Sequence, residues 1–407
     1  MPKKPAPKAG FTLLTVLLGA VGAGPLLLYG LSATSDSIIT ELGIDAVQFG
    51  LLATVCFACA AVGNAALGRL ADRRSDILLM SALFLLAAVA LVLAGLPGGY
   101  ALLLVAAGLS GIAQSFSNGV TNRILLERVP AAQRIGWVGI KQSGVQVSQL
   151  VASLAFPLLA LWVGWRGAAL VGSLIPFILL LLAWHALSST PRLGPDNSPR
   201  GTTSTSSPPP LRPGLTRHSG TVWALAAFGL LNGIGVQATN VYLPLFAVRE
   251  LGFSLVLGGA TAAVAGVVGV AARVGWARVM ARGASAPTLL LVLALTALAG
   301  AAAFLGAGMT DWAALLWLAV ILHGASALGV AVVLMSALLR STPASSMASV
   351  SGIVTAGMFA GFTLGPVGMG AIISSSGGFQ LGWIAVGVVY SACTALALVL
   401  IKRTEAS

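Results

Sequence analysis

The chain is built from long apolar runs that are separated by short polar stretches. A transmembrane helix needs about 20 mostly apolar residues, and twelve runs reach that length. They lie near residues 11–34, 47–67, 77–96, 101–125, 136–163, 167–187, 221–247, 254–275, 286–307, 312–338, 347–373 and 380–401. The pattern therefore predicts an all-α integral membrane protein with twelve transmembrane helices.

The middle of the chain breaks this pattern. Residues 188–220 are rich in Pro, Ser, Thr and Gly, a composition that cannot bury a core. We predict an N-terminal six-helix bundle over 1–187, a disordered cytoplasmic tether over 188–220 and a C-terminal six-helix bundle over 221–407. The bundles are expected to be pseudo-symmetric, because "GRLADRR" follows the second run and "ARVMARG" follows the eighth.

Composition supports a lipid environment. Hydrophobic residues form 57% of the chain and charged residues only 8%, whereas soluble domains carry about a quarter charged residues. The net charge of +12 does not indicate nucleic acid, since no basic run is interleaved with aromatic residues. The loops between runs divide by charge, with most basic residues on one side. The other side has Arg166 and Arg249 together with the acids Asp36, Glu41, Asp45, Glu250 and Asp311. The positive-inside rule then predicts a cell (inner) membrane protein with both termini cytoplasmic.

Signatures of enzymes and metal sites are absent from the sequence. It contains no HExxH motif, no paired carboxylates and no histidine cluster. Cys56 and Cys59 have the spacing of a metal or redox pair, but no second ligand pair accompanies them, so we interpret them as buried thiols. We expect no catalytic residue, no metal and no cofactor.

The loop "GRLADRRSD", Gly68 to Asp76, concentrates charge between two apolar runs. It resembles the loop motif of the major facilitator superfamily of secondary transporters, which has Gly, three residues, Asp, a basic residue, any residue, Gly and a basic tail. Gly68, Asp72 and Arg73 match, whereas Ser75 replaces the second Gly and Asp76 begins an acidic and apolar replacement of the tail. The span number and the central tether extend the resemblance over essentially the whole chain.

The resemblance implies alternating access through a central cavity, and it gives the charged loop a role. A carboxylate at Asp72 would face the positive N-terminal end of the eleventh span, near Ser345–Ser349, and would latch the two halves together. The predicted latch consists of Gly68, Asp72, Arg73, Arg74 and Glu127. The alternative is ordinary positive-inside loop charge, which explains the arginines but not Asp72.

The eleventh span carries glycines four residues apart, at Gly357, Gly361 and Gly365, followed by Pro366. Glycines at this spacing let helix backbones approach closely, and a proline can kink a span. We predict close helix packing here, with a moving hinge as the alternative.

Polar side chains deep in a span are costly and therefore indicate a functional site. In the run 136–163, Gln142, Gln146, Gln149 and Ser153 share one helix face next to Lys141. The resemblance implies that the first, fourth, seventh and tenth spans line the cavity and that the fifth, eighth and eleventh flank it. The predicted substrate-binding residues are Lys141, Gln142, Gln146, Gln149, Asn118, Asn122, Arg123, Gln237, Asn240, Tyr242 and His323.

These residues could also have a purely structural role instead of binding substrate. Interhelical amide hydrogen bonds occur in any bundle, Lys141 could reach the interface by snorkelling, and His323 could be a buried packing residue rather than a proton carrier. Lys141, Arg123 and Arg273 lie inside spans or near span ends, whereas no Asp or Glu lies mid-span. This charge pattern predicts a secondary active or facilitative transporter of a small organic anion or polar metabolite; the alternative is a multidrug exporter of amphipathic compounds. The expected partners are a small-molecule substrate, protons as a candidate coupling ion, and the lipid bilayer, with the chain monomeric.

Overall fold

The computed structural model describes residues 10–71, 74–190, 220–341 and 347–405, and over these ranges every regular element is helical. The first half contains α1 (Phe11–Ala33), α2 (Ser35–Leu42), α3 (Ala46–Ala71), α4 (Asp76–Gly95), α5 (Gly99–Ser115), α6 (Ser117–Arg128), α7 (Ala131–Gln142), α8 (Gly144–Gly172) and α9 (Leu174–Ser189). The second contains α10 (Gly220–Arg249), α11 (Leu255–Ala281), α12 (Ala286–Thr310), α13 (Ala313–Ser326), the 3₁₀ turn η1 (Ala327–Gly329), α14 (Val330–Ser341), α15 (Met347–Ile373) and α16 (Gly378–Glu405).

Within the described ranges, 11 continuous helical stretches are long and apolar enough to cross a membrane. One of them, Gly136–Ser189, has 54 residues, more than twice the length of about 20 residues that a bilayer requires. Gly164 interrupts it with φ 68° and ψ 170°, a conformation that is readily accessible only to glycine. The chain reverses there, so this stretch contributes two crossings. The predicted twelve-helix fold is confirmed.

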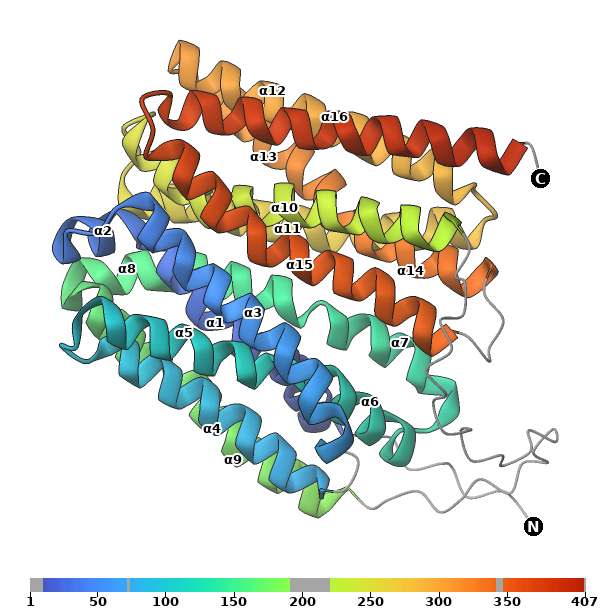
Figure 1. Ribbon diagram of the computed structural model, residues 1–407. Helices are drawn as coiled ribbons and strands as arrows, with labels where there is room; N and C mark the ends of the chain where they lie inside the picture. Colours follow the sequence, from blue (N-terminus) through green and yellow to red (C-terminus); the bar gives the residue numbers. More distant parts are fainter. Residues whose placement is uncertain (1–9, 72–73, 191–219, 342–346, 406–407) are drawn as a thin grey trace.

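The helices form two bundles, α1–α9 and α10–α16 (Figure 1). The bundles meet along two seams, where α3 packs against α15 and α8 packs against α11. Most of the predicted tether, 188–220, lies outside the described residues; α9 extends to Ser189 and α10 begins at Gly220. We call the side on which α1 begins and α16 ends the terminal side, and the opposite side the far side.

Large apolar side chains that remain exposed lie on the outer helices, for example Leu85 on α4, Trp184 on α9 and Val388 on α16. Such a surface would be unfavourable in water but matches lipid chains. By contrast, nearly all of α1 from Ala20 and of α10 from Asn232 is buried. These two helices form the centre of their respective bundles.

The glycines of α15 face α10 across a very short distance. A methyl group on each of them would lie 2.2–2.5 Å from an α10 carbonyl oxygen; the pairs are Gly357 with Ala226, Gly361 with Leu230, and Gly365 with Ile234. The next residue, Pro366, has its carbonyl oxygen 2.5 Å from where a methyl on Gly50 of α3 would lie. This part of α15 therefore packs against its own half and against the other half at once.

The first half contains the matching close approach. A methyl group on Gly144, at the start of α8, would lie 2.2 Å from the carbonyl oxygen of Leu18 on α1. Gly144 and Gly357 thus both bring the fifth span of a half onto its first span. The pseudo-symmetry predicted from the sequence is present in the packing.

Candidate functional site

A cavity of about 990 Å³ lies between the two halves. Its wall includes residues of α1, α3, α5, α6, α8, α10, α11, η1, α14 and α15. On the terminal side the lining residues Asn64, Asn118 and Gly352 are exposed. Towards the far side, Ser32 and Tyr242 are buried. The cavity is therefore open at the terminal side and closed at the far side.

Among the described residues of this wall, Arg273 of α11 is the charged one. Its Nη1 donates to Oε1 of Gln146 on α8 at 3.0 Å, and its Nε donates to the carbonyl oxygen of Leu328 at 3.1 Å. A guanidinium group has five N–H donors, so donors remain for a ligand. No Asp or Glu is present among the described residues that line the cavity. The site therefore has a positive charge that the described wall does not neutralise.

Amide side chains of α10 line the same cavity. Asn232 donates to the carbonyl oxygen of Ala327 at 3.3 Å, and Oδ1 of Asn240 lies 3.1 Å from Nε2 of His323. The buried Oε1 of Gln237 has no hydrogen-bond partner among the described residues. Buried polar atoms are usually hydrogen-bonded, so Gln237 has capacity for a ligand or a water molecule.

The structure brings four of the predicted substrate-binding residues to the cavity wall: Asn118, Gln146, Gln237 and Asn240. Gln149 instead donates to the carbonyl oxygen of Ala262 at 3.1 Å, which links α8 to α11. His323 is buried behind Asn240, so its role as a proton carrier stays a prediction.

Lys141 is fully buried inside the first half rather than in the cavity wall. Its Nζ donates to Oγ1 of Thr121 at 2.9 Å and to Oδ1 of Asn122 at 2.5 Å, with Oδ1 of Asn118 at 3.5 Å. Gln142 also donates to Asn118, at 3.3 Å. Lys141 therefore does not snorkel; it joins α7 to α6. In this conformation the cationic group of the site is Arg273 instead of Lys141.

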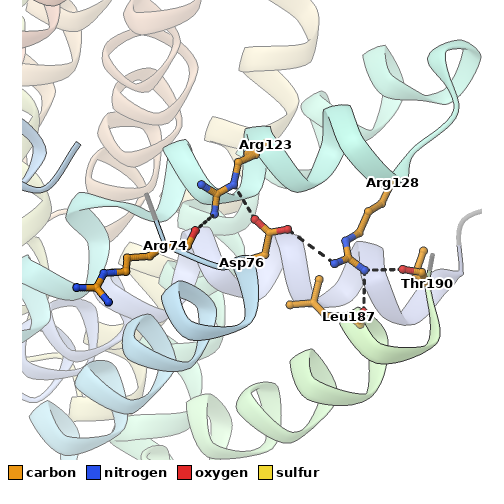
Figure 2. Close-up of polar contacts among 6 residues, drawn as sticks. All are labelled: Arg74, Asp76, Arg123, Arg128, Leu187 and Thr190. Carbon is orange, nitrogen blue, oxygen red and sulfur yellow. Dashed lines mark hydrogen bonds and ion pairs between the residues drawn. The ribbon is translucent and has the colours of Figure 1, made fainter. Parts of the chain in front are cut away.

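Arg123 also lies outside the cavity wall. Figure 2 shows it in a cluster of polar contacts around Asp76. Its Nε forms an ion pair with Asp76 at 2.7 Å, and its Nη2 donates to the carbonyl oxygen of Arg74 at 2.9 Å. Arg128 lies 3.7 Å from the second carboxylate oxygen of Asp76. Asp76 was noted only as a departure from the family motif, yet it is the carboxylate at the centre of this described cluster.

Part of the predicted latch lies outside the described residues. Asp72 and Arg73 are outside the described residues, as is most of the segment before α15. Gly68 lies within α3, Arg74 is exposed and Glu127 is half-buried. The latch from Asp72 to the eleventh span stays a prediction.

Tyr242 holds the two halves together at the far side. Its hydroxyl donates to the carbonyl oxygen of Ala46 at 2.5 Å, and Ser32 donates to the carbonyl oxygen of Val241 at 2.8 Å. An ion pair between Asp36 and Arg249, at 2.7 Å, adds a partly exposed contact. Tyr242 was predicted to bind substrate; here it is part of the far-side closure.

Tyr29 and Asn64 line the cavity but were not singled out in the sequence. Asn232 and Arg273 also line it; they stood out only as a polar residue of the run 221–247 and a cation near a span end, and were not among the predicted substrate-binding residues. Arg273 carried a usable signal, because an arginine inside an apolar run is costly unless it faces a polar interior. Its position two residues before the end of the run 254–275 made it look like a residue at the membrane surface.

Solved structures with the same architecture are membrane transporters. A bacterial homolog of the human lysosomal transporter Spinster, in an inward-facing and unoccupied conformation, superposes with a TM-score of 0.78 at 17% identity, over 95% of this chain and 96% of that one. The nucleoside transporter NupG gives a TM-score of 0.70 at 15% identity, over 96% of this chain and 99% of that one. At these identities the likeness concerns the fold.

The sequence comparisons agree with this likeness in fold. A protein of Haemophilus influenzae described as "Putative metabolite transport protein" is 27% identical over 234 residues, which is 56% of this chain and 57% of that protein. The match thus spans little more than half of that relative. The family model of the Major Facilitator Superfamily matches residues 11–354. The chain belongs to the Major Facilitator Superfamily.

Proposed function

We propose that this transporter moves a small organic anion by alternating access through the central cavity. The observation that carries the proposal is Arg273, a guanidinium group in the cavity wall with spare donors and no acidic residue among its described lining. An anion would supply the missing charge and accept charge-assisted hydrogen bonds. Gln237 and Asn240 lie in the same wall, and their amide groups could orient its polar groups.

The same observation argues against the alternative of an exporter of cationic drugs. A lipophilic cation would place a second positive charge beside Arg273, and like charges at close range repel. Such a substrate calls for a carboxylate in the membrane region, and the described cavity lining has none.

In the orientation that we propose, the protein lies in the cell (inner) membrane and its terminal side faces the cytoplasm. Exposed Arg74, Arg278, Arg282, Lys402 and Arg403 lie on that side. The far-side arginines, by contrast, are paired with acids, Arg166 with Glu41 and Arg249 with Asp36. The excess of positive charge on the terminal side matches the positive-inside rule. An impermeant thiol reagent on intact cells should then label a cysteine at Thr310 and spare one at Ser285; the reverse labelling would contradict this orientation.

Ligand binding to the purified protein tests the anion proposal. A panel of organic anions, cations and neutral solutes is screened by thermal shift, since a ligand that binds the native state raises its apparent stability. For an anion that stabilises the protein, Arg273→Gln should weaken binding by about one to two decades, because a charge-assisted hydrogen bond is worth about 1.5–3 kcal/mol.

The matched control is Arg278→Gln, which removes an exposed arginine of the same helix outside the cavity wall. It should leave binding unchanged. Stabilisation by cations alone, or an Arg273→Gln protein that binds the anion with unchanged affinity, would refute the proposal.

A further inference from the structure

We infer that the substrate is an amphipathic organic anion, with its charged group at Arg273 and its apolar body against an aromatic wall formed by Phe57, Phe359 and Phe362. This inference rests on the proposed function and adds the substrate class. It follows from the unequal chemistry of the two seams that enclose the cavity.

The seam between α8 and α11 contributes the polar part of the cavity wall. Gln146 on α8 and Arg273 on α11 are joined by a hydrogen bond of 3.0 Å, and both line the cavity. Asn232 and Gln237 of α10 also line it. An anionic group bound here would meet a positive charge and amide groups.

The other seam, between α3 and α15, lies in front of α8 and α11 in Figure 1. It contributes Phe57 from α3 and Phe359 and Phe362 from α15, which all line the cavity. The ring centroids of Phe57 and Phe362 are 5.5 Å apart, and those of Phe359 and Phe362 are 5.7 Å apart. The three rings thus form one continuous aromatic surface that faces the cavity.

The aromatic rings are not the only contact across the α3–α15 seam. Gly50 also lies against Pro366, and the hydroxyl of Thr54 donates to the carbonyl oxygen of Thr363 at 2.7 Å. Phe359 and Phe362 are only half-buried, so part of each ring is left to the open cavity. Apolar surface that faces water is unfavourable, by about 25 cal/mol per Å². A ligand with an apolar body would cover it.

The size of the cavity supports the same substrate class. Pockets of about 300–1,000 Å³ hold ligands the size of drugs, and this cavity measures about 990 Å³. A small inorganic anion at Arg273 would leave the aromatic wall uncovered. A neutral apolar molecule would cover the wall but leave the guanidinium donors unpaired, which is costly when they are desolvated. Only a molecule with both parts satisfies both walls.

Binding of a homologous series tests the inference. Straight-chain carboxylates from propionate to decanoate, together with 3-phenylpropionate, are titrated against the purified full-length protein, each alongside its uncharged amide. We expect carboxylate affinity to rise about three- to fourfold for each added methylene until the wall is covered. The amides should bind at least tenfold more weakly, and Arg273→Gln should abolish the difference between acid and amide.

A second variant examines the aromatic wall itself. Phe362→Leu keeps an apolar side chain and removes the ring, so it should weaken 3-phenylpropionate binding by about three- to tenfold. Phe253→Leu, which removes a ring outside the cavity wall, is the control and should have no effect.

The outcomes separate this inference from the proposed function. Carboxylate affinity that does not depend on chain length, but is lost in Arg273→Gln, would overturn the amphipathic substrate and retain the anion. Amides that bind as tightly as the acids would overturn both the inference and the proposed function. Acids that bind Arg273→Gln with unchanged affinity would do the same. Failure of every member of the series to bind would also overturn the inference.

Discussion

At the scale of single residues, Asp76 shows how one carboxylate can order the ends of several helices. It is only 2% exposed at the start of α4, and it holds Arg123 and Arg128, both of α6 (Figure 2). Arg128 in turn donates to the carbonyl oxygens of Leu187 and Thr190, at 2.7 and 2.5 Å, at the end of α9. A negative charge at a helix N-terminus is also favoured by the helix dipole.

Asp76→Asn should therefore destabilise the first half. The change keeps the shape of the side chain but leaves two arginines near each other without this counter-charge. Breaking a fully buried ion pair costs about 3–5 kcal/mol; because Arg123 and Arg128 are partly exposed, we expect about 2 kcal/mol in the free energy of unfolding. Thermal unfolding in detergent measures the change.

Glu41→Gln is the comparison, since Glu41 pairs with Arg166 at a more exposed position. Exposed ion pairs are worth about 0–1 kcal/mol, so the loss should be smaller. Equal losses in the two variants would contradict the role that we give to Asp76.

At the scale of elements, the contact between α15 and α10 depends on having no side chain at three positions. A methyl group at Gly361 would lie 2.2 Å from the carbonyl oxygen of Leu230 and 2.8 Å from the backbone nitrogen of Ile234. Backbone atoms cannot move aside as a flexible side chain can. The glycines thus set the distance between the two helices, which in turn places the aromatic wall of α15.

Gly361→Ala should destabilise the protein by about 1–3 kcal/mol, the usual cost of overpacking. Gly368→Ala, on the same helix, has nothing within 4 Å of the added methyl group. It should be neutral or stabilising by about 0.5–1 kcal/mol, because alanine favours a helix over glycine. Thermal unfolding of both variants measures the difference, and a Gly361→Ala protein as stable as Gly368→Ala would contradict the close packing.

At the scale of the whole molecule, the described residues join the two halves at the far side and leave the cavity between them open at the terminal side. The far-side contacts include Tyr242 to Ala46, Ser32 to Val241, and the ion pair of Asp36 with Arg249. Under the alternating access that we propose, these contacts must break when the cavity opens at the far side. Their strength would then contribute to the balance between the two states.

Tyr242→Phe removes one of these contacts and should shift the population towards the state that is open at the far side. A neutral hydrogen bond contributes about 1 kcal/mol, which corresponds to about a fivefold change in the equilibrium. Spin labels at Thr40 and Thr310, in a background without the native cysteines, report the separation of the halves by their distance distribution.

Tyr100→Phe provides the control, because the Tyr100 hydroxyl donates to the carbonyl oxygen of Gln48 within the first half, at 2.8 Å. This variant should leave the distances between the halves unchanged. An unaltered distribution in Tyr242→Phe would show that the Tyr242 hydroxyl does not stabilise the far-side closure.

The sequence by itself determined the number of spans and the class of the protein. Bilayer thickness imposes a helix length on every crossing, and that length is visible in a one-dimensional apolar pattern. Even the reversal at Gly164, inside an unbroken helical stretch, was indicated by the break in the pattern between 163 and 167. Close packing along α15 was likewise indicated by the spacing of Gly357, Gly361 and Gly365.

Only the tertiary structure decided which polar residues meet in the cavity. Lys141 and Arg273 both read as cations near the end of an apolar run, yet Lys141 is buried against Thr121 and Asn122, whereas Arg273 reaches the cavity. The direction of a polar side chain depends on the rotation of its helix and on the neighbours it finds, which are distant in sequence. Periodicity shows that polar residues share a face, but the partner of that face is set by how the two halves pack.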